Sequence, residues 1–162
     1  MERLRKAEAQ LVRLETALLV VILTVMISLS FLQVVLRHFG AGLLWADTLS
    51  RYLVLWLGFL GAALAASQGK HFAWEAAAER PGKGGAALRL IAMLAAAAVT
   101  VVLARASWTF FADERQSASV LFNVGSVAVP SWTAALAIPT GFMLVLAHLL
   151  VRAAQAAEEF RR

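Results

Sequence analysis

Long apolar runs without charged residues alternate with short charged blocks along the whole chain. The first run covers residues 16–36, with Arg13 and Glu15 before it and Arg37 after it. A helix of this length reaches roughly 31 Å, which is about one hydrocarbon thickness of a bilayer. Three further runs cover residues 52–69, about 90–112 and about 131–151.

These four runs predict four transmembrane helices. Backbone polar groups find no water partners in lipid, so the runs should be helical, and the alternation of a β-barrel is absent. Leucines recur between Leu4 and Leu18 at spacings that predict a short amphipathic segment leading into the first span. We therefore expect an all-α integral membrane protein, residues 1–162 forming one domain, with helices over about residues 15–37, 48–69, 88–112 and 131–152.

The distribution of basic residues predicts the orientation of these spans. Eleven of the 15 Lys and Arg residues lie in the N-terminal segment, in the 70–89 connection or in the C-terminal tail. The positive-inside rule places these three segments in the cytoplasm, so both termini should lie on the cytoplasmic side of a bacterial inner membrane. Trp45, Trp108 and Trp132 then fall near the outer interface, where aromatic side chains are enriched.

Composition narrows the possible chemistry. The chain is 61% hydrophobic, which is well above the usual share in soluble domains. It contains no cysteine, which excludes disulfides, thiolate metal sites and iron–sulfur clusters. The net charge is +5, but the basic residues flank the apolar runs. Topology signals and contacts with anionic membrane lipids explain that placement better than nucleic-acid binding does.

The predicted spans lack the features that let a membrane protein move a solute by itself. No Asp or Glu lies inside an apolar run, so no proton relay is evident. Pro139-Thr140-Gly141 is the one sign of a broken helix, and we interpret it as a structural kink. Arg105 is the one charge within an apolar run, and we expect it to reach the outer lipid headgroups together with Trp108 and Trp132.

Small residues recur every four positions in two of the predicted spans. Such faces let two helices approach closely. Such faces could pack against other helices of the same chain or against a partner protein, and the sequence leaves both possibilities open. The helix-packing candidates are Gly58, Gly61, Ala62 and Ala66 in the second span and Ala92 and Ala96 in the third, which Thr100 and Ala104 continue.

The first outer connection holds the densest polar cluster of the chain: Arg37, His38, Trp45, Asp47 and Arg51. The last two are spaced i, i+4, which favours a salt bridge near the start of the second helix. A helix cap with a surface ion pair and a partner interface are both compatible with this cluster.

Histidines raise the alternative of a haem-binding membrane anchor of a respiratory redox enzyme. His71 and His148 both fall near the predicted cytoplasmic side, but His71 lies beyond its apolar run and His38 lies at the opposite side. We therefore expect no haem and no other cofactor. Another alternative is a small exporter that works without partners. The absence of an Asp or Glu inside the apolar runs disfavours it.

Several motifs in order resemble the small membrane subunit (DctQ type) of tripartite ATP-independent periplasmic (TRAP) transporters. The resemblance covers almost the whole chain. One departure is Thr48, because the family usually has a second acidic residue there. The motifs are Phe31-Leu32-Gln33-Val34-Val35-Leu36-Arg37, Trp45-Ala46-Asp47, Arg51-Tyr52-Leu53, Trp56, Phe59-Leu60-Gly61-Ala62, His71, Val129-Pro130-Ser131-Trp132 and Ile138-Pro139-Thr140-Gly141-Phe142.

The resemblance implies a non-enzymatic subunit of a three-protein, sodium-driven uptake system for an organic acid. A periplasmic substrate-binding protein would capture the acid, and a large elevator-type membrane subunit would carry the substrate and sodium sites. The small subunit would scaffold the static part of the large one. Candidates for contacts with these partners are Arg37, Trp45, Asp47, Arg51 and Trp56.

Overall fold

The computed structural model describes residues 2–68 and 83–159, which are mainly helical. Within them, four helices are long and apolar enough to cross a membrane, which confirms the predicted all-α fold with four spans. In order, the elements are α1 (Glu2–His38), α2 (Leu44–Gln68), α4 (Lys83–Ser117), β1 (Val120–Val124), β2 (Val127–Pro130), α5 (Trp132–Ala135) and α6 (Ala137–Glu159).

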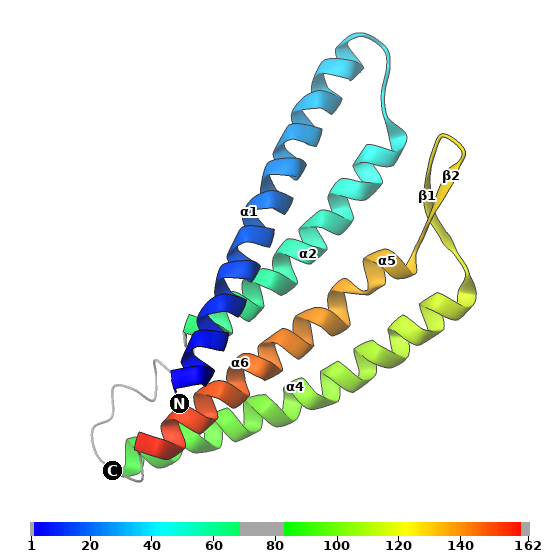
Figure 1. The fold of residues 1–162 in the computed structure, drawn as a ribbon. Helices are drawn as coiled ribbons and strands as arrows, with labels where there is room; N and C mark the ends of the chain where they lie inside the picture. The colour runs from blue at the N-terminus through cyan, green and yellow to red at the C-terminus, as the bar shows by residue number, and fades with distance from the viewer. Residues whose placement is uncertain (1, 69–82, 160–162) are drawn as a thin grey trace.

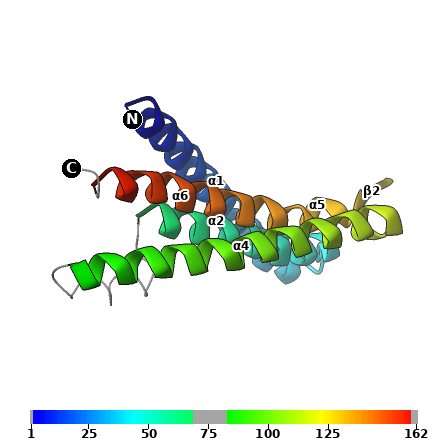
Figure 2. The same cartoon turned by 90° about the horizontal axis from the view of Figure 1, so that it is seen from below.

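The long helices form an open row and not a closed bundle. Their spatial order is α1, α2, α6, α4: α2 packs against both α1 and α6, and α6 packs against α4 (Figures 1 and 2). Among the described residues α1 and α4 share no extensive contact, and they form the two edges of the row. A closed bundle would hide its apolar seams in a common core, whereas this row leaves apolar surface on both faces.

The two ends of the row differ in what they carry. Helix α1 begins and α6 ends at the same end, which we call the terminal end (Figure 1). The α1–α2 connection and the β1–β2 hairpin lie at the other, which we call the hairpin end (Figure 1). An even number of spans places both chain ends on one side of the membrane. That this side is the cytoplasm stays a prediction.

Helix α1 is longer than predicted. It is continuous from Glu2, so the expected amphipathic segment and the first span form one helix, which reaches roughly 55 Å. It ends in a Schellman motif: Ala41 N–H donates to the Leu36 carbonyl at 2.9 Å and Gly40 N–H to the Arg37 carbonyl at 3.1 Å. Gly40 adopts the φ of +77° that this cap requires.

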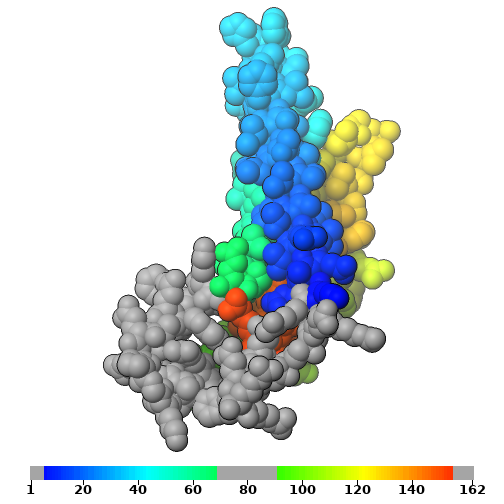
Figure 3. Space-filling view, turned by 60° about the vertical axis from the view of Figure 1, so that its left-hand side comes forward, coloured from blue at the N-terminus to red at the C-terminus, as the bar shows by residue number. Residues whose placement is uncertain are grey.

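One narrow stripe of α1 is covered by the rest of the chain. Its residues recur at alternating intervals of four and three, as at the seam of a coiled coil. Between them the helix is exposed along its length, as Figure 3 shows. From residue 15 onward the stripe consists of Glu15, Leu19, Ile22, Met26, Leu29, Gln33 and Leu36, and Glu8, Leu11 and Val12 continue it toward the start of the helix.

The connection between α4 and α5 contains a small antiparallel sheet that was not predicted from the sequence. Strands β1 and β2 pair from Val120↔Pro130 to Val124↔Val127, with an irregularity between Val120 and Phe122. Gly125, at φ +60°, supplies the backbone conformation of the turn between them. The hairpin folds back against α2, and the ring of Phe122 stacks on Trp45 with centroids 6.4 Å apart.

The predicted fourth span is divided into α5 and α6, with the interruption at Leu136. Pro139 has no backbone N–H to donate to the Ala135 carbonyl, so one helical hydrogen bond is missing here. Leu136 nevertheless keeps helical dihedrals, and its carbonyl accepts from Thr140 N–H at 3.2 Å. In α6 the same proline falls in the first turn, where the missing N–H leaves no bond unmade. The irregularity at Leu136 thus lies just before Pro139-Thr140-Gly141, which the sequence predicts to be a structural kink.

Candidate functional site

The predicted partner-interface residues lie at the hairpin end and have different surroundings. Arg51 donates from its guanidinium to Asp47 Oδ2 at 2.9 Å, and the two side chains are 78% and 49% exposed. Arg37 is exposed at the end of α1. Trp45 is half-buried against the hairpin, and Trp56 is half-buried one turn after Tyr52 and Leu53.

The Asp47–Arg51 pair contributes little to the stability of the chain. Exposed i, i+4 pairs are worth roughly 0.3–0.5 kcal/mol, because water screens them and both side chains lose freedom. Their charged groups nevertheless face outward and are accessible to a second protein. The geometry is thus compatible with both readings of this cluster, the surface cap and the partner contact.

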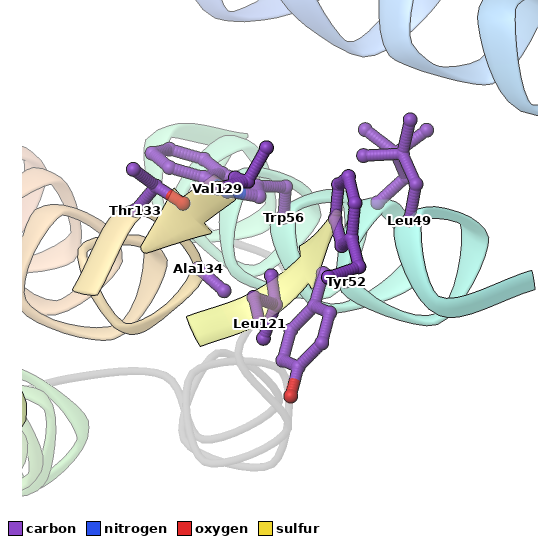
Figure 4. Close-up of a pocket in the computed structure, with 9 residues that line it drawn as sticks. Leu49, Tyr52, Trp56, Leu121, Val129, Thr133 and Ala134 are labelled. Atoms are coloured by element: carbon purple, nitrogen blue, oxygen red, sulfur yellow. The ribbon is translucent and has the colours of Figure 1, made fainter. Parts of the chain in front are cut away.

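A cavity of about 190 Å³ lies between the first half of α2 and the hairpin (Figure 4). Thr133 is its one hydroxyl-bearing residue besides Tyr52, and its Oγ1 already donates to the Pro130 carbonyl at 2.7 Å. The lining contains no ionisable acid or base other than the Tyr52 phenol, so this cavity is not built to hold an organic acid. It is lined by Leu49, Tyr52, Leu53, Trp56, Leu121, Phe122, Val129, Thr133 and Ala134.

Hydroxyl groups hold the base of the hairpin to the end of α4. Ser119 donates to Glu114 Oε1 at 2.7 Å, and its carbonyl accepts from Ser131 N–H at 2.9 Å. The hydroxyls of Ser119 and Ser131 are also hydrogen-bonded to each other. These contacts hold the hairpin over α2, where Phe122 stacks on Trp45 and the hairpin forms one wall of the cavity.

The small residues predicted to mediate packing fall on different surfaces. In α2, Gly58 and Ala62 are exposed, Gly61 is half-buried and Ala66 is buried. A Cβ added at Gly58 or Gly61 would meet no atom within 4 Å. Ala66 thus packs within the chain, whereas the surface around Gly58 and Ala62 is open to a neighbouring helix.

In α4 the small residues lie on the covered side of the helix. Ala92 and Ala96 are half-buried, and Thr100 is buried with its hydroxyl donating to the Ala96 carbonyl at 2.7 Å. Helix α6 is the main neighbour of α4, so this stripe packs inside the row.

The predicted headgroup residues cluster around the hairpin half of α4. Trp108 is 57% exposed and lies 5.6 Å from the ring of Phe111, which in turn meets Trp132 edge-on at 6.4 Å. Arg105 is exposed and lies roughly 18 Å along the helix axis from Ser117. The longer α4 places Arg105 farther from the helix end than expected; its contact with headgroups stays a prediction.

The structure brings together two residues that the sequence analysis did not connect. Nε2 of His148, in α6, lies 3.0 and 3.2 Å from the two carboxylate oxygens of Glu15, in α1. Both side chains are at least 98% buried. We had treated Glu15 only as a boundary of the first span. No local signal singled out Glu15, because the stripe of α1 on which it lies is set by burial and not by hydrophobic periodicity.

This contact also bears on the haem alternative. The Nε2 atom of His148 is taken by Glu15, and His38 lies at the opposite end of the row. His71 lies outside the described residues. The described histidines therefore form no facing pair that would ligate a haem iron.

A second polar contact joins α6 to the last turn of α2. Arg152 of α6 donates from Nε to the Ser67 carbonyl at 3.0 Å, and a second guanidinium nitrogen donates to the same oxygen. The last carbonyls of a helix have no partner within it, so the arginine satisfies one of them and complements the negative end of the α2 dipole. Together the two contacts connect α6 to α1 and to α2.

Comparison with known proteins gives two findings. Residues 26–159 match the family described as tripartite ATP-independent periplasmic transporters, DctQ component. A protein of Haemophilus influenzae, named as a TRAP transporter small permease protein, is 36% identical over 92 residues. That segment covers 56% of this chain and 57% of the relative, so the chain matches somewhat more than half of the relative's length.

Proposed function

This chain belongs to the DctQ family of tripartite ATP-independent periplasmic transporter components, and we propose that it scaffolds the large membrane subunit of such a transporter. As a family member it is a multi-pass small permease subunit and not an enzyme. The transporter would take up an organic acid, driven by sodium, after capture by a periplasmic binding protein. Both termini of this subunit would lie on the cytoplasmic face of the inner membrane.

The observation that carries the scaffold proposal is the open row of helices. No residue in the most apolar part of α1 is buried within the chain, and large side chains such as Ile27, Phe31 and Val34 are 60–72% exposed. Lipid can cover such a surface, but so can a larger membrane protein that packs along it. An open row presents a broad face for that contact, which a closed bundle would not.

The polar groups of the described chain support a static role. Coupled transport needs ionisable groups or broken helices around a polar site near the middle of the membrane. Here the carboxylate of Glu15 and the ring of His148 contact each other inside the row, and the cavity at the hairpin end is apolar. The substrate and sodium sites would accordingly belong to the large subunit.

Asp47 and Arg51 are our candidates for the outer contact with the large subunit or the binding protein. Their side chains are exposed and contribute little to the fold. Charged groups of this kind mainly steer and orient a partner.

The first test is co-purification of the tagged chain, in mild detergent, with the large membrane protein encoded beside its gene. We expect a stable one-to-one complex without haem absorbance. If the chain purifies alone or with a coloured redox partner, the scaffold proposal is wrong.

The second test is sodium-driven uptake into proteoliposomes with the binding protein added. We expect the double variant Asp47→Ala/Arg51→Ala to reduce uptake at an unchanged amount of complex or to weaken the complex. The matched control is Asp113→Ala/Arg115→Ala, which removes two exposed charges from α4. Equal uptake by both variants and the wild type would remove Asp47 and Arg51 from the proposed interface.

A further inference from the structure

We propose that the cavity between α2 and the β1–β2 hairpin binds an acyl chain of a membrane phospholipid, which enters from the leaflet at the hairpin end. The isolated chain forms this site without help from another protein. Three features of the cavity identify the ligand: its closure at both ends, its uncharged and mainly apolar lining, and its depth in the membrane spans.

Helix α2 forms one wall of the cavity, and the hairpin and α5 form the other (Figure 4). Among the described residues α2 and α5 make no extensive direct contact. The cavity is partly open toward the outside of the chain, so a molecule can enter it sideways from the membrane.

Aromatic contacts delimit the cavity along α2. About one turn before its lining residues on this helix, which lie between residues 49 and 56, the ring of Trp45 stacks on Phe122 with centroids 6.4 Å apart. About one turn after them, Phe59 meets Phe142 edge-on at 5.4 Å. Both contacts join α2 to the chain opposite, so the cavity between them is a slot that extends roughly 10 Å along the helix.

The lining selects hydrocarbon over water or a polar ligand. It contains no Asp, Glu, Lys, Arg or His, and the Thr133 hydroxyl already donates to the Pro130 carbonyl at 2.7 Å. A water molecule needs polar partners, so an apolar cavity of this kind stays dry, and one of about 150 Å³ binds benzene. At about 190 Å³ this cavity can take a short stretch of an alkyl chain, which restores the dispersion contacts that an empty space lacks.

The depth of the cavity makes a phospholipid the source of that chain. Helices α2 and α5 belong to two candidate membrane spans, Leu44–Gln68 and Trp132–Ala154. On α2 the charged residue nearest to the slot is Arg51, directly before the uncharged run that begins at Tyr52. The slot therefore begins near the level at which headgroups give way to acyl chains, and hydrocarbon is what reaches its open side.

The charged groups at the start of α2 do not take part in this site. By the helical period, Asp47 and Arg51 lie on the opposite face of α2 from the residues that line the cavity. They also form an ion pair with each other. The site should thus bind an acyl chain whatever the charge of its headgroup, which distinguishes it from electrostatic binding of anionic lipids.

Quenching of tryptophan fluorescence by a phospholipid that is brominated on its acyl chains tests this site, because Trp56 lies in its wall. The probe is titrated in detergent into the purified chain. We expect a saturable loss of fluorescence with one-to-one stoichiometry, equal for brominated phosphatidylcholine and brominated phosphatidylglycerol. The saturable part should largely vanish in Trp56→Phe, which removes the reporter and keeps an aromatic ring.

Filling the slot separates a bound chain from ordinary boundary lipid. Ala134→Leu places extra methyl groups in the cavity and should abolish the saturable quenching. Ala98→Leu is the matched control, the same substitution at an exposed position of α4, and should retain it. Should Ala134→Leu fail to fold, Val129→Phe fills the slot from the hairpin side and replaces it in the test.

Several results would overturn the proposal. Quenching that rises without saturation, or that saturates equally in the wild type and the filled variants, would show boundary lipid only. A response confined to phosphatidylglycerol would indicate binding through headgroup charge. The titration is then repeated on the co-purified complex with the large membrane subunit. Loss of the saturable quenching there, but not in the isolated chain, would assign the cavity to a side chain of that subunit in place of a lipid.

Discussion

Phe59 of α2 lies directly against Gly141 of α6, so closely that a Cβ on Gly141 would be 2.5 Å from the Cβ of Phe59. The ring of Phe59 also meets that of Phe142 edge-on at 5.4 Å. The same face of α2 buries Leu60, Ala63 and Ala66. Small residues on both helices allow this close approach. Within lipid the hydrophobic effect does not drive helices together, so close van der Waals packing of this kind stabilises the contact.

Gly141→Ala should therefore destabilise the chain by about 1–3 kcal/mol, because the added methyl forces α2 and α6 apart. Thermal unfolding in detergent would measure the loss. The matched control is Gly61→Ala, where the added Cβ meets nothing within 4 Å. It should be neutral or stabilising by up to about 1 kcal/mol, from helix propensity. Equal effects of the two substitutions would show that the close contact is not needed.

The exposed surface around Gly58 and Ala62 should matter only when a partner is present. We expect Gly58→Leu/Ala62→Leu to leave the thermal stability of the isolated chain within about 0.5 kcal/mol of the wild type, as for other exposed positions. The same variant should reduce co-purification of the large membrane subunit. Unchanged complex formation would mean that this surface faces lipid.

A matched control for that experiment is Leu94→Ala/Val102→Ala on the exposed side of α4. It removes exposed apolar surface from a different helix, whereas the α2 variant adds apolar bulk. If it weakens the complex as much as the α2 variant does, the loss cannot be assigned to the small-residue surface.

The hairpin should depend on the contact between Phe122 and Trp45. Phe122→Ala removes an aromatic pair worth about 0.5–1.5 kcal/mol and part of the cavity wall. We expect faster amide hydrogen exchange across residues 120–130, with little change in the long helices. Val127→Ala, at a position that is 64% exposed in the same hairpin, should leave exchange unchanged. Uniformly faster exchange in the whole chain would instead indicate general destabilisation.

Pro139 removes one helical hydrogen bond at the junction of α5 and α6, and its ring is fully buried. Pro139→Ala supplies the missing N–H, so amide exchange around Leu136 should slow, while the cavity left by the ring should lower the thermal stability by about 1–2 kcal/mol. Ala147→Pro, in the interior of α6, should cost about 3 kcal/mol by comparison. Unchanged exchange around Leu136 in Pro139→Ala would show that the missing hydrogen bond does not weaken this junction.

The number and approximate limits of the spans were predictable because the bilayer sets a length and a polarity for every spanning segment. Charged blocks interrupt the apolar runs, and no tertiary information is needed to find them. The family was also recognisable from local motifs, such as the one around Trp45, Asp47 and Arg51. The Asp47–Arg51 contact itself followed from i, i+4 spacing within one helix.

Which face of each helix meets a neighbour was decided by the tertiary structure alone. In a lipid-facing helix the outside is as apolar as the inside, so the hydrophobic periodicity that separates core from surface in soluble proteins carries little signal. Gly58, Ala62 and Ala66 therefore looked equivalent in sequence, yet Ala66 is buried and the other two are exposed. The contact of Gly141 with Phe59 was hidden for the same reason.

Contacts between distant parts of the chain could not be predicted from local sequence patterns either. The hairpin depends on pairing between β1 and β2 and on a face of α2 that covers it. Glu15 and His148 are separated by 133 residues, and each by itself reads as the edge of a span. Sequence alone determined that this protein crosses the membrane four times and which family it belongs to. Only the folded arrangement of α1 against α6 turns a boundary carboxylate and a lone histidine into a buried pair, because burial and charge compensation belong to the contact and not to either residue.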